Sequence, residues 1–405
     1  MAWHAGRDLR LLLAANLVSL VGDWTLRTGI AYQIYVLTGS TLASAGAVLA
    51  SLIPPIALGT LAGTVADRAD RRLLMAGVNL LMAVALLPLL AVHGAGDAWL
   101  VYAVLAVQSC LAPFFATAEA ALLPALTPPD RLVTANALNG QIRDIARLLG
   151  AALGGIVAAA GGIPLLAVAD AASFLLAAGL LFLIRVRPVR SAASRAAGHG
   201  GWRIVARSRV LRVFVAFSLV TGIGEAAIGV LAAPFVRDVL GGDSRAYGFV
   251  MGVQAVGGLA GGLAVTLVGH RFPPRAMFGW GTVAFGLVDL ALFLYPLVWQ
   301  ALWPAAVLIG LAGLPAAVLV AGGLTVFQRA TAEAERGRVW GAITTVDSGA
   351  MLAGTLAAGA LAGRFGVLPV ITTQGAAYTL AGVLVVLALR PSDDAPRADL
   401  RLAPA

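Results

Sequence analysis

Long apolar runs alternate with short polar connections along almost the whole chain. A helix needs about 20 mostly apolar residues to cross the hydrocarbon core of a bilayer, and twelve runs reach that length. The first six are residues 11–36, 43–65, 73–93, 98–123, 137–160 and 163–185. The second six are residues 210–234, 246–269, 276–298, 301–325, 340–363 and 367–389. The pattern therefore predicts an all-α polytopic membrane protein with twelve transmembrane helices.

One connection, residues 63–72, is far more charged than the runs on either side of it. It holds two aspartates and three arginines: Asp67, Arg68, Asp70, Arg71 and Arg72. Charged side chains at this density are costly in hydrocarbon. The stretch therefore predicts a membrane–water boundary between the second and third helices.

Arginines are divided unequally between the two sides of this predicted membrane. The connection at 63–72 shares its side with the N-terminus, the segment 186–209 and the connection that follows Arg329. The opposite side holds three arginines: Arg237, Arg245 and Arg364. Because arginine-rich loops remain in the cytoplasm, we expect a multi-pass protein of the cell inner (cytoplasmic) membrane with both termini cytoplasmic.

The two sets of six runs are internal repeats of one another. Asp23 matches Glu225 at an offset of 202 residues, and Gly150 matches Gly354 at an offset of 204. Parallel repeats of this kind are typical of transporter halves that face one another across a central cavity.

The basic segment between the repeats divides the chain into four expected parts. They are an N-terminal six-helix half (1–185), a cytoplasmic linker (186–209), a C-terminal six-helix half (210–389) and a cytoplasmic tail (390–405). Trp202 and Val205 interleave with the arginines of the linker, so an amphipathic helix on the membrane surface is the alternative reading of that segment.

The composition argues against several functional classes. Of the 405 residues, 60% are hydrophobic, compared with about half in soluble proteins. The net charge of +9 arises from arginines in short connections, which does not favour a nucleic-acid-binding role. The single Cys110 forms no disulfide framework, and the four histidines fall at the ends of runs or in loops. With no Walker sequence and no hydrolase triad, we expect no enzyme activity, no cofactor and no metal.

Two acidic residues, Asp23 and Glu225, are placed at mid-membrane depth by the repeat. An ionised carboxylate there costs a few kcal/mol unless it faces a cavity or a partner, and burial of a carboxyl favours the neutral form. Both residues are therefore candidates for proton coupling. For Asp23 the alternative is a local ion pair with Arg27, four residues on and on the same helix face.

A second group of charges lies near the inner ends of the fourth and fifth helices. Glu119 is about one turn inside the end of its helix, and the antiparallel neighbour brings Arg143, Asp144 and Arg147 to a similar depth. We expect a structural charge network here. The alternative is that Arg143 or Arg147 lines the inner vestibule.

Several motifs resemble those of the major facilitator superfamily. Residues 63–72 are similar to its G-x-x-x-D-R-x-G-R-R signature, with Asp70 where the family usually has glycine. Gly150 to Gly155 resembles its G-P-x-x-G-G antiporter signature, with alanine in place of proline. Other stretches resemble the enterobactin-exporter and macrolide-efflux-like branch: Ser19 to Trp24, Leu37 to Ser40, Ala121 to Pro124, Ala135-Asn136, Phe327 to Thr331 and Arg336 to Val339.

The resemblance implies a secondary active transporter, specifically a proton-coupled exporter of a small amphipathic molecule such as a drug, siderophore or secondary metabolite. It would work in the lipid bilayer as a monomer, exchanging substrate for protons. An importer or uniporter is one alternative, and a non-transporting receptor or scaffold is another. The expected substrate cavity lies between helices 1, 4, 7 and 10, with these residues: Trp24, Arg27, Tyr32, Tyr35, Phe114, Phe115 and Asp347.

Two further aspartates are left outside the expected pathway. Asp289 lies on helix 9, which is peripheral in the family, and Asp170 is expected near the outer, water-accessible end of helix 6.

The resemblance also assigns roles to the charged connection and to the glycines. Asp67 would engage the start of helix 11, near Arg338 and Val339, as a conformational latch. The latch residues are Gly63, Asp67, Arg68, Arg71 and Arg72, and the expected helix-packing glycines are Gly150, Gly154 and Gly155. In the second half the corresponding stretch, residues 265–274, has lost both acids and keeps His270 and Arg271.

Overall fold

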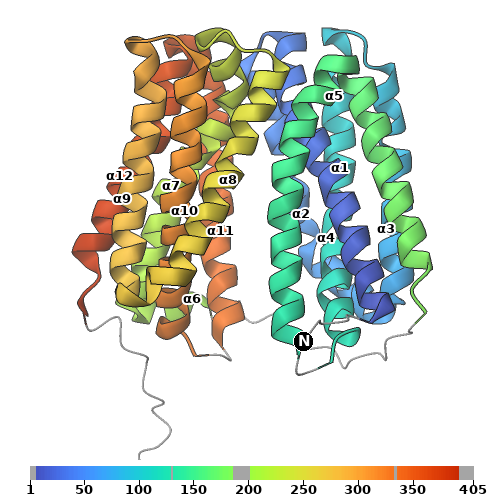
Figure 1. Cartoon of the computed structure of the whole chain (residues 1–405), viewed down its shortest axis with the longest axis horizontal. Coiled ribbons are helices and arrows are strands. Elements are labelled where there is room, and N and C mark those ends of the chain that lie inside the picture. Colours follow the sequence, from blue (N-terminus) through green and yellow to red (C-terminus); the bar gives the residue numbers. More distant parts are fainter. Residues whose placement is uncertain (1–5, 129–130, 186–200, 333–334, 392–405) are drawn as a thin grey trace, which may run out of the picture. The chain divides into compact units, whose positions relative to one another are not determined.

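A computed structural model of the chain describes residues 6–128, 131–185, 201–332 and 335–391, and within its helices it leaves a few side chains undescribed. Every regular element in these ranges is helical (Figure 1). The elements before the linker are α1 (Arg7–Thr38), α2 (Thr41–Arg68), α3 (Arg71–Ala85), η1 (Leu87–Ala91), η2 (Ala95–Asp97), α4 (Ala98–Ala125) and α5 (Leu132–Phe182). Those after it are α6 (Gly201–Arg207), α7 (Arg209–Pro234), η4 (Phe235–Val239), α8 (Ser244–Val268), η5 (Gly269–Arg271), α9 (Pro274–Leu294), η6 (Tyr295–Leu297), α10 (Leu302–Ala330), α11 (Arg336–Phe365) and α12 (Val367–Ala388).

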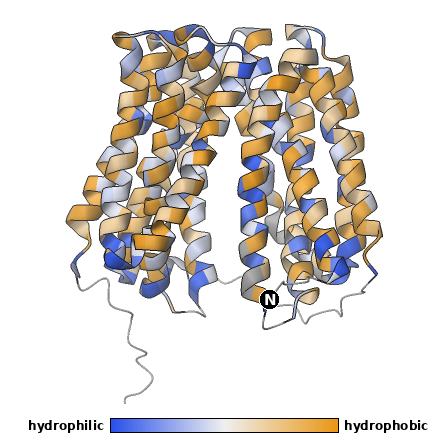
Figure 2. Ribbon diagram, in the orientation of Figure 1, coloured by the Kyte–Doolittle hydropathy of each residue, from blue (hydrophilic) through white to orange (hydrophobic). Residues whose placement is uncertain are grey.

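The prediction of an all-α polytopic membrane protein is confirmed. Ten segments among the described residues are long and apolar enough to cross a bilayer, and hydrophobic residues cover the lengths of the helices (Figure 2). One of the ten, residues 138–182, holds two of the predicted spans. The remaining predicted span corresponds to α2, whose apolar part is described as Thr41–Pro55.

The two spans within α5 are joined at a pair of glycines. Gly161 has φ −157° and ψ 18°, and Gly162 has φ 60° and ψ −152°. The positive φ of Gly162 favours glycine because it has no Cβ. The chain therefore changes direction between residues 160 and 163, where the apolar pattern predicts one helix to end and the next to begin.

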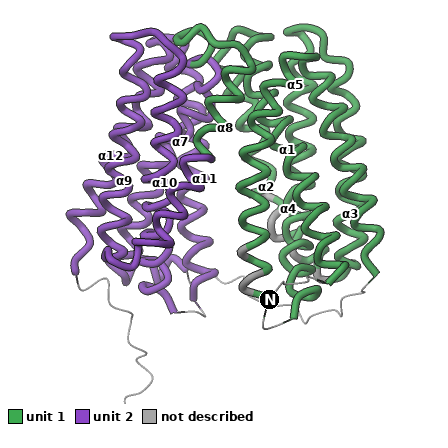
Figure 3. Tube along the Cα trace, viewed as in Figure 1, with its two compact units in different colours: residues 1–194, 236–255 green, residues 195–235, 256–405 purple. Residues whose placement is uncertain are grey.

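The described chain divides into two compact units (Figure 3). The first contains residues 1–194 with 236–255, and the second contains residues 195–235 with 256–405. In the first unit, α1 packs along α5 because small residues let the two backbones approach. A Cβ on Gly154 would lie 2.7 Å from the Thr25 carbonyl oxygen, so this approach depends on the glycine.

Residues 236–255 belong to the first unit through contacts with α1 and α5. The hydroxyl of Tyr32 donates to the Gly242 carbonyl at 3.1 Å, and the Tyr35 hydroxyl donates to the Asp238 carboxylate. Gly155 of α5 faces Gly248 of α8: a Cβ added to Gly155 would lie 3.0 Å from the Gly248 Cα. The compact units therefore differ from the sequence repeats by this segment.

The second unit is centred on aromatic packing and includes the end of the basic linker. Phe214 stacks on Phe278 with ring centroids 5.0 Å apart, and Phe327 meets Phe214 edge-on at 6.0 Å. Helix α6 packs on α11, and its Val205 is buried. The described part of the predicted linker is thus a short helix, while residues 186–200 lie outside the described residues.

Candidate functional site

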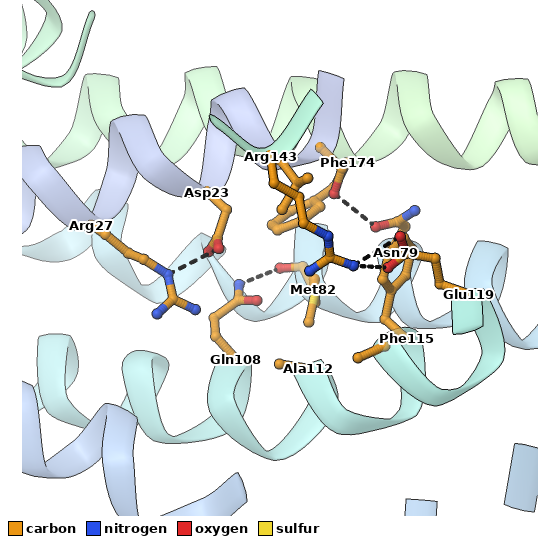
Figure 4. Close-up of a pocket in the computed structure, with 13 residues that line it drawn as sticks. Asp23, Arg27, Asn79, Met82, Gln108, Ala112, Phe115, Glu119, Arg143 and Phe174 are labelled. Carbon is orange, nitrogen blue, oxygen red and sulfur yellow. Dashed lines mark hydrogen bonds and ion pairs between the residues drawn. The ribbon is translucent and has the colours of Figure 1, made fainter. Parts of the chain in front are cut away.

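The first unit contains a small cavity between α1, α3, α4 and α5 (Figure 4). Its volume is about 150 Å³. The residues that line it are Ser19, Leu20, Asp23, Arg27, Asn79, Met82, Gln108, Ala112, Phe115, Ala116, Glu119, Arg143 and Phe174. The walls therefore combine two acid–arginine pairs and two amides with apolar and aromatic side chains.

Asp23 and Arg27 form an ion pair at the cavity wall. Arg27 Nε donates to Asp23 Oδ2 at 2.9 Å, one helical turn away on α1. The Asp23 side chain is 27% exposed and the Arg27 side chain is 41% exposed. The local pairing that the spacing of these residues allows is therefore present, and it lies at the cavity rather than on the outside of the bundle.

Asp170 of α5 lies close to this pair. It is fully buried, and the charges of Asp23 and Arg27 both act on it. Ser173 Oγ donates to Asp170 Oδ1 at 3.0 Å, whereas Oδ2 is buried without a hydrogen-bond partner. The expectation that water reaches Asp170 is wrong, because the segment after Gly162 carries it into the helix interface beside Gly22.

Two amides at the cavity wall have hydrogen-bonding atoms without partners. Ser19 Oγ donates to Asn79 Oδ1 at 3.4 Å, and Gln108 Nε2 donates to the Met82 carbonyl at 2.9 Å. The other amide atoms, Asn79 Nδ2 and Gln108 Oε1, are buried without a partner in the structure. Buried polar atoms are usually satisfied, so this donor and this acceptor are suited to a ligand or to water.

Glu119 is the centre of a second polar group at the same cavity. Arg143 Nη2 donates to both carboxylate oxygens, at 2.9 and 2.8 Å. Asn16 and Asn139 also donate to Oε1, at 2.9 and 2.7 Å. Glu119 is 4% exposed, so these donors replace the water that its charge would otherwise require.

Two members of the expected charge network lie elsewhere. Asp144 and Arg147 are exposed on α5 and are absent from the contacts of Glu119. The network around Glu119 instead includes two asparagines from the apolar helices, Asn16 and Asn139.

The expected cavity residues of the first unit divide into three groups. Arg27 and Phe115 line the cavity. Trp24 lies against Gly150 at the α1–α5 interface, and Phe114 packs against the hydrophobic core. Tyr32 and Tyr35 lie nearer the end of α1 and bond to the segment 236–255.

The second unit contains its own buried polar group. Tyr378 of α12 donates to Glu225 Oε2 of α7 at 2.8 Å. Gln374 Nε2 donates to Asp289 Oδ2 at 3.0 Å, and both residues are 2% exposed. Asp289 and Glu225 are close enough for their charges to interact. Asp289, which the sequence assigns to a peripheral helix, therefore lies inside the unit next to the coupling candidate Glu225.

Asp347 of α11 is a partly buried member of the second unit. It lies beside Gly222 of α7: a Cβ added to Gly222 would be 3.1 Å from the carbonyl oxygen of Asp347. Its charge acts on Tyr378, which places it near the Glu225 group.

The charged connection between α2 and α3 is largely tied to its own unit. Asp70, the departure from the family glycine, caps α3 by accepting from the backbone N–H of Arg72 at 3.0 Å and of Leu73 at 3.3 Å. Arg71 Nη1 donates to the Ala121 carbonyl at 3.3 Å, and Arg72 donates to the carbonyl at residue 184.

The remaining latch residues are Arg68, Gly63 and Asp67. Arg68 is exposed at the end of α2. The side chain of Asp67 and the surroundings of Gly63 lie outside the described part of the structure. The latch therefore stays a prediction.

No group of three or more His, Cys, Asp or Glu side chains within the described ranges could hold a metal ion.

Comparison with known proteins agrees with the fold. The family model described as "Transmembrane secretion effector" matches residues 4–401. The uncharacterized MFS-type transporter YfiS of Bacillus subtilis (strain 168) is 25% identical over 414 residues, covering 94% of this chain and 93% of that protein. The multidrug efflux pump Tap of Mycobacterium tuberculosis (strain ATCC 25618 / H37Rv) is 28% identical over 409 residues, covering 96% of each.

A solved structure supports the same fold. A bacterial homologue of the iron transporter ferroportin, in its inward-facing state, superposes with a TM-score of 0.77 at 17% identity, covering 94% of this chain and 98% of that one. At this identity the likeness shows the fold alone. The family match covers nearly the whole chain, and the chain therefore belongs to the major facilitator superfamily, in its efflux branch.

Proposed function

We propose that this protein exports a small amphipathic molecule in exchange for protons. The observation that carries the proposal is the cavity of the first unit, which is lined by the Asp23–Arg27 pair, unpartnered amide atoms and aromatic side chains. The similarity to a multidrug efflux pump supports the direction of transport.

The size of the cavity indicates how much of a substrate it could hold. Its volume of about 150 Å³ is below the roughly 300–1,000 Å³ of pockets that enclose drug-sized ligands. The cavity would therefore receive the polar end of an amphipathic substrate. Asn79 Nδ2 and Gln108 Oε1 would bind that end, and Phe115 and Phe174 would contact its apolar part.

The charges around Arg27 support proton coupling. Asp23 and Asp170 are two acids next to one guanidinium. Ionisation of both leaves one negative charge uncompensated within this trio, and a buried uncompensated charge is costly. A single proton on either carboxyl balances the trio. Substrate and proton would therefore occupy the site in opposite access states and shift the population between them.

Glu225 provides the corresponding carboxyl of the second unit. Its partner Tyr378 is a neutral hydroxyl, and the nearby Asp289 adds a second acid. Tyr378 and Gln374, which donate to these two acids, are neutral, so a proton on one of the acids would instead relieve the repulsion between two like charges. Each unit would then contribute one coupling site.

Uphill export in inverted membrane vesicles tests the proposal. With ethidium as the probe, vesicles containing the wild-type protein should accumulate the dye when a proton gradient is present, and should lose it when nigericin collapses the gradient. Asp23→Asn should abolish gradient-driven uptake because it removes the ionisable group while retaining the side-chain shape.

Asp144→Asn is the matched control, since Asp144 is an exposed acid in the same unit. It should transport like the wild type. Full uphill export by the double variant Asp23→Asn/Glu225→Gln would contradict proton coupling through these residues.

A further inference from the structure

Asp170 of α5 is a buried acid that forms no ion pair within the described residues. Its side chain is 0% exposed, and its Oδ2 has no hydrogen-bond partner. The charges that act on it belong to Asp23 and Arg27 of α1, which are bonded to each other at 2.9 Å. An ionised carboxylate in this place would be strongly destabilised, because burial removes its hydration and a single hydroxyl replaces it.

The hydrogen bonds of Ser173 also favour a neutral Asp170. Ser173 Oγ lies 2.8 Å from the backbone carbonyl oxygen of Asp170 and 3.0 Å from its Oδ1. The hydroxyl has one hydrogen, so it can donate fully to one of these two acceptors. When Asp170 carries a proton on Oδ1, this O–H donates to Ser173 Oγ, and Ser173 Oγ–H donates to the backbone carbonyl. Each hydrogen then has its own acceptor, and no charge is buried.

The second repeat has a neutral amide at the position of Asp170. Gln374 corresponds to it at the offset of 204, and Gly224 corresponds to Gly22 at the offset of 202. A Cβ added to Gly22 would lie 2.4 Å from Asp170 Oδ1, and a Cβ added to Gly224 would lie 3.2 Å from the Gln374 Cα. Both residues therefore pack against the same glycine position. Because an amide fills this place in the second repeat, helix packing does not require an acid there.

Asp23 lies between Asp170 and the cavity. Asp23 lines the cavity and is 27% exposed, whereas Asp170 is fully buried. Gly22, directly before Asp23, has no side chain to separate α1 from the Asp170 carboxyl. A proton that enters from the cavity therefore meets Asp23 first.

We infer that Asp170 holds the coupling proton, and that Asp23 passes this proton between Asp170 and the cavity. The inference rests on the proposed proton exchange and assigns its proton to one carboxyl. In the transfer the O–H bond of Asp23 breaks, an O–H bond forms on Asp170 Oδ1, and Asp23 is left ionised beside Arg27. Release of the proton leaves two carboxylates beside one guanidinium, and this change of charge shifts the population toward the other access state.

Infrared spectroscopy of the full chain at neutral pH tests where the proton resides. A protonated carboxyl has a C=O band, identified by its shift in heavy water, that a carboxylate lacks. Asp170→Asn should lose one such band of the wild type, and Asp23→Asn should retain it. Ser173→Ala should shift the same band to higher frequency, because the carboxyl loses its hydrogen-bond partner. Asp144→Asn, at an exposed position of the same unit, is the control and should leave the band unchanged.

A band that persists in Asp170→Asn, or that disappears in Asp23→Asn, would overturn the assignment even if the wild type exchanges protons. If Asp170→Asn unfolds, Ser173→Ala decides, since an unshifted spectrum contradicts a proton on Asp170. Transport tests the coupling role: in proteoliposomes loaded with the pH dye pyranine, Asp170→Asn should carry ethidium down its gradient with no change in internal pH. Wild-type ethidium entry without a pH change would overturn the proposed function, and the coupling role of Asp170 with it, whether or not the band is present.

Discussion

Replacing Glu119 with alanine tests whether the buried polar group around it holds the first unit together. Asn16 and Asn139 each donate to this carboxylate, and a hydrogen bond to a charged group contributes about 1.5–3 kcal/mol. Arg143 is half exposed, so its ion pair adds no more than about 1 kcal/mol. Removing the carboxylate also relieves its own desolvation. We expect a net loss of about 2–4 kcal/mol in the free energy of unfolding.

The single cysteine of the chain provides the assay. Cys110 is partly buried in α4, the same helix as Glu119, so a maleimide dye that fluoresces on reaction reports the unfolding of that helix during heating. A loss of 2–4 kcal/mol corresponds to a fall in melting temperature of about 5–15 °C. Asp144→Asn, at an exposed position, should melt like the wild type. A melting temperature of Glu119→Ala within about 2 °C of the wild type would refute the reasoning.

Three further substitutions test other contacts. Gly154→Ala should lower the free energy of unfolding by about 1–3 kcal/mol, because its Cβ would lie 2.7 Å from the Thr25 carbonyl oxygen. The control Gly179→Ala, whose Cβ would meet nothing within 4 Å, should leave the free energy of unfolding unchanged. Equal melting temperatures of the two variants would contradict this packing. Asp70→Ala should cost about 1 kcal/mol through loss of the α3 cap, and Asp70→Ser should restore it. Asp67→Asn should favour the inward-facing state, measured as labelling by an impermeant thiol reagent from the cytoplasmic side; unchanged labelling would contradict the latch.

The helices could be predicted closely because apolar length and turn residues determine them. The predicted span at 98–123 lies within α4 (Ala98–Ala125), and the predicted break after residue 160 falls at Gly161 and Gly162. Single apolar runs of about 20 residues have few alternatives in a bilayer. The repeat likewise placed Asp23 and Glu225 in corresponding helices.

The polar groups could not be predicted as well, because they depend on which helix faces meet. Asn16, Asn79 and Gln108 are single amides within apolar runs, and nothing in a one-dimensional pattern shows that they face a cavity. One signal was available in the repeat. Asp170 and Gln374 correspond at the offset of 204, and both prove to be buried. Matching polar residues in both halves indicate an interior position for each.

Tyr32 and Tyr35 show how little residue type alone says about the contacts of a side chain. Aromatic residues on an inner helix suggest substrate contact, but both hydroxyls bond to residues of the segment 236–255. Whether a residue of α1 lines the cavity depends on its position along the helix, because both tyrosines lie one or more turns beyond the cavity residue Arg27. Residue type alone does not reveal it.

Proton movement during ethidium transport tests the central claim most directly. Proteoliposomes are loaded with the pH dye pyranine, and ethidium is added outside with no initial pH gradient. Proton exchange predicts that ethidium entry raises the internal pH in the wild type, and that the double variant Asp23→Asn/Glu225→Gln produces no pH change. Ethidium entry through the wild-type protein with no change in internal pH would contradict the account.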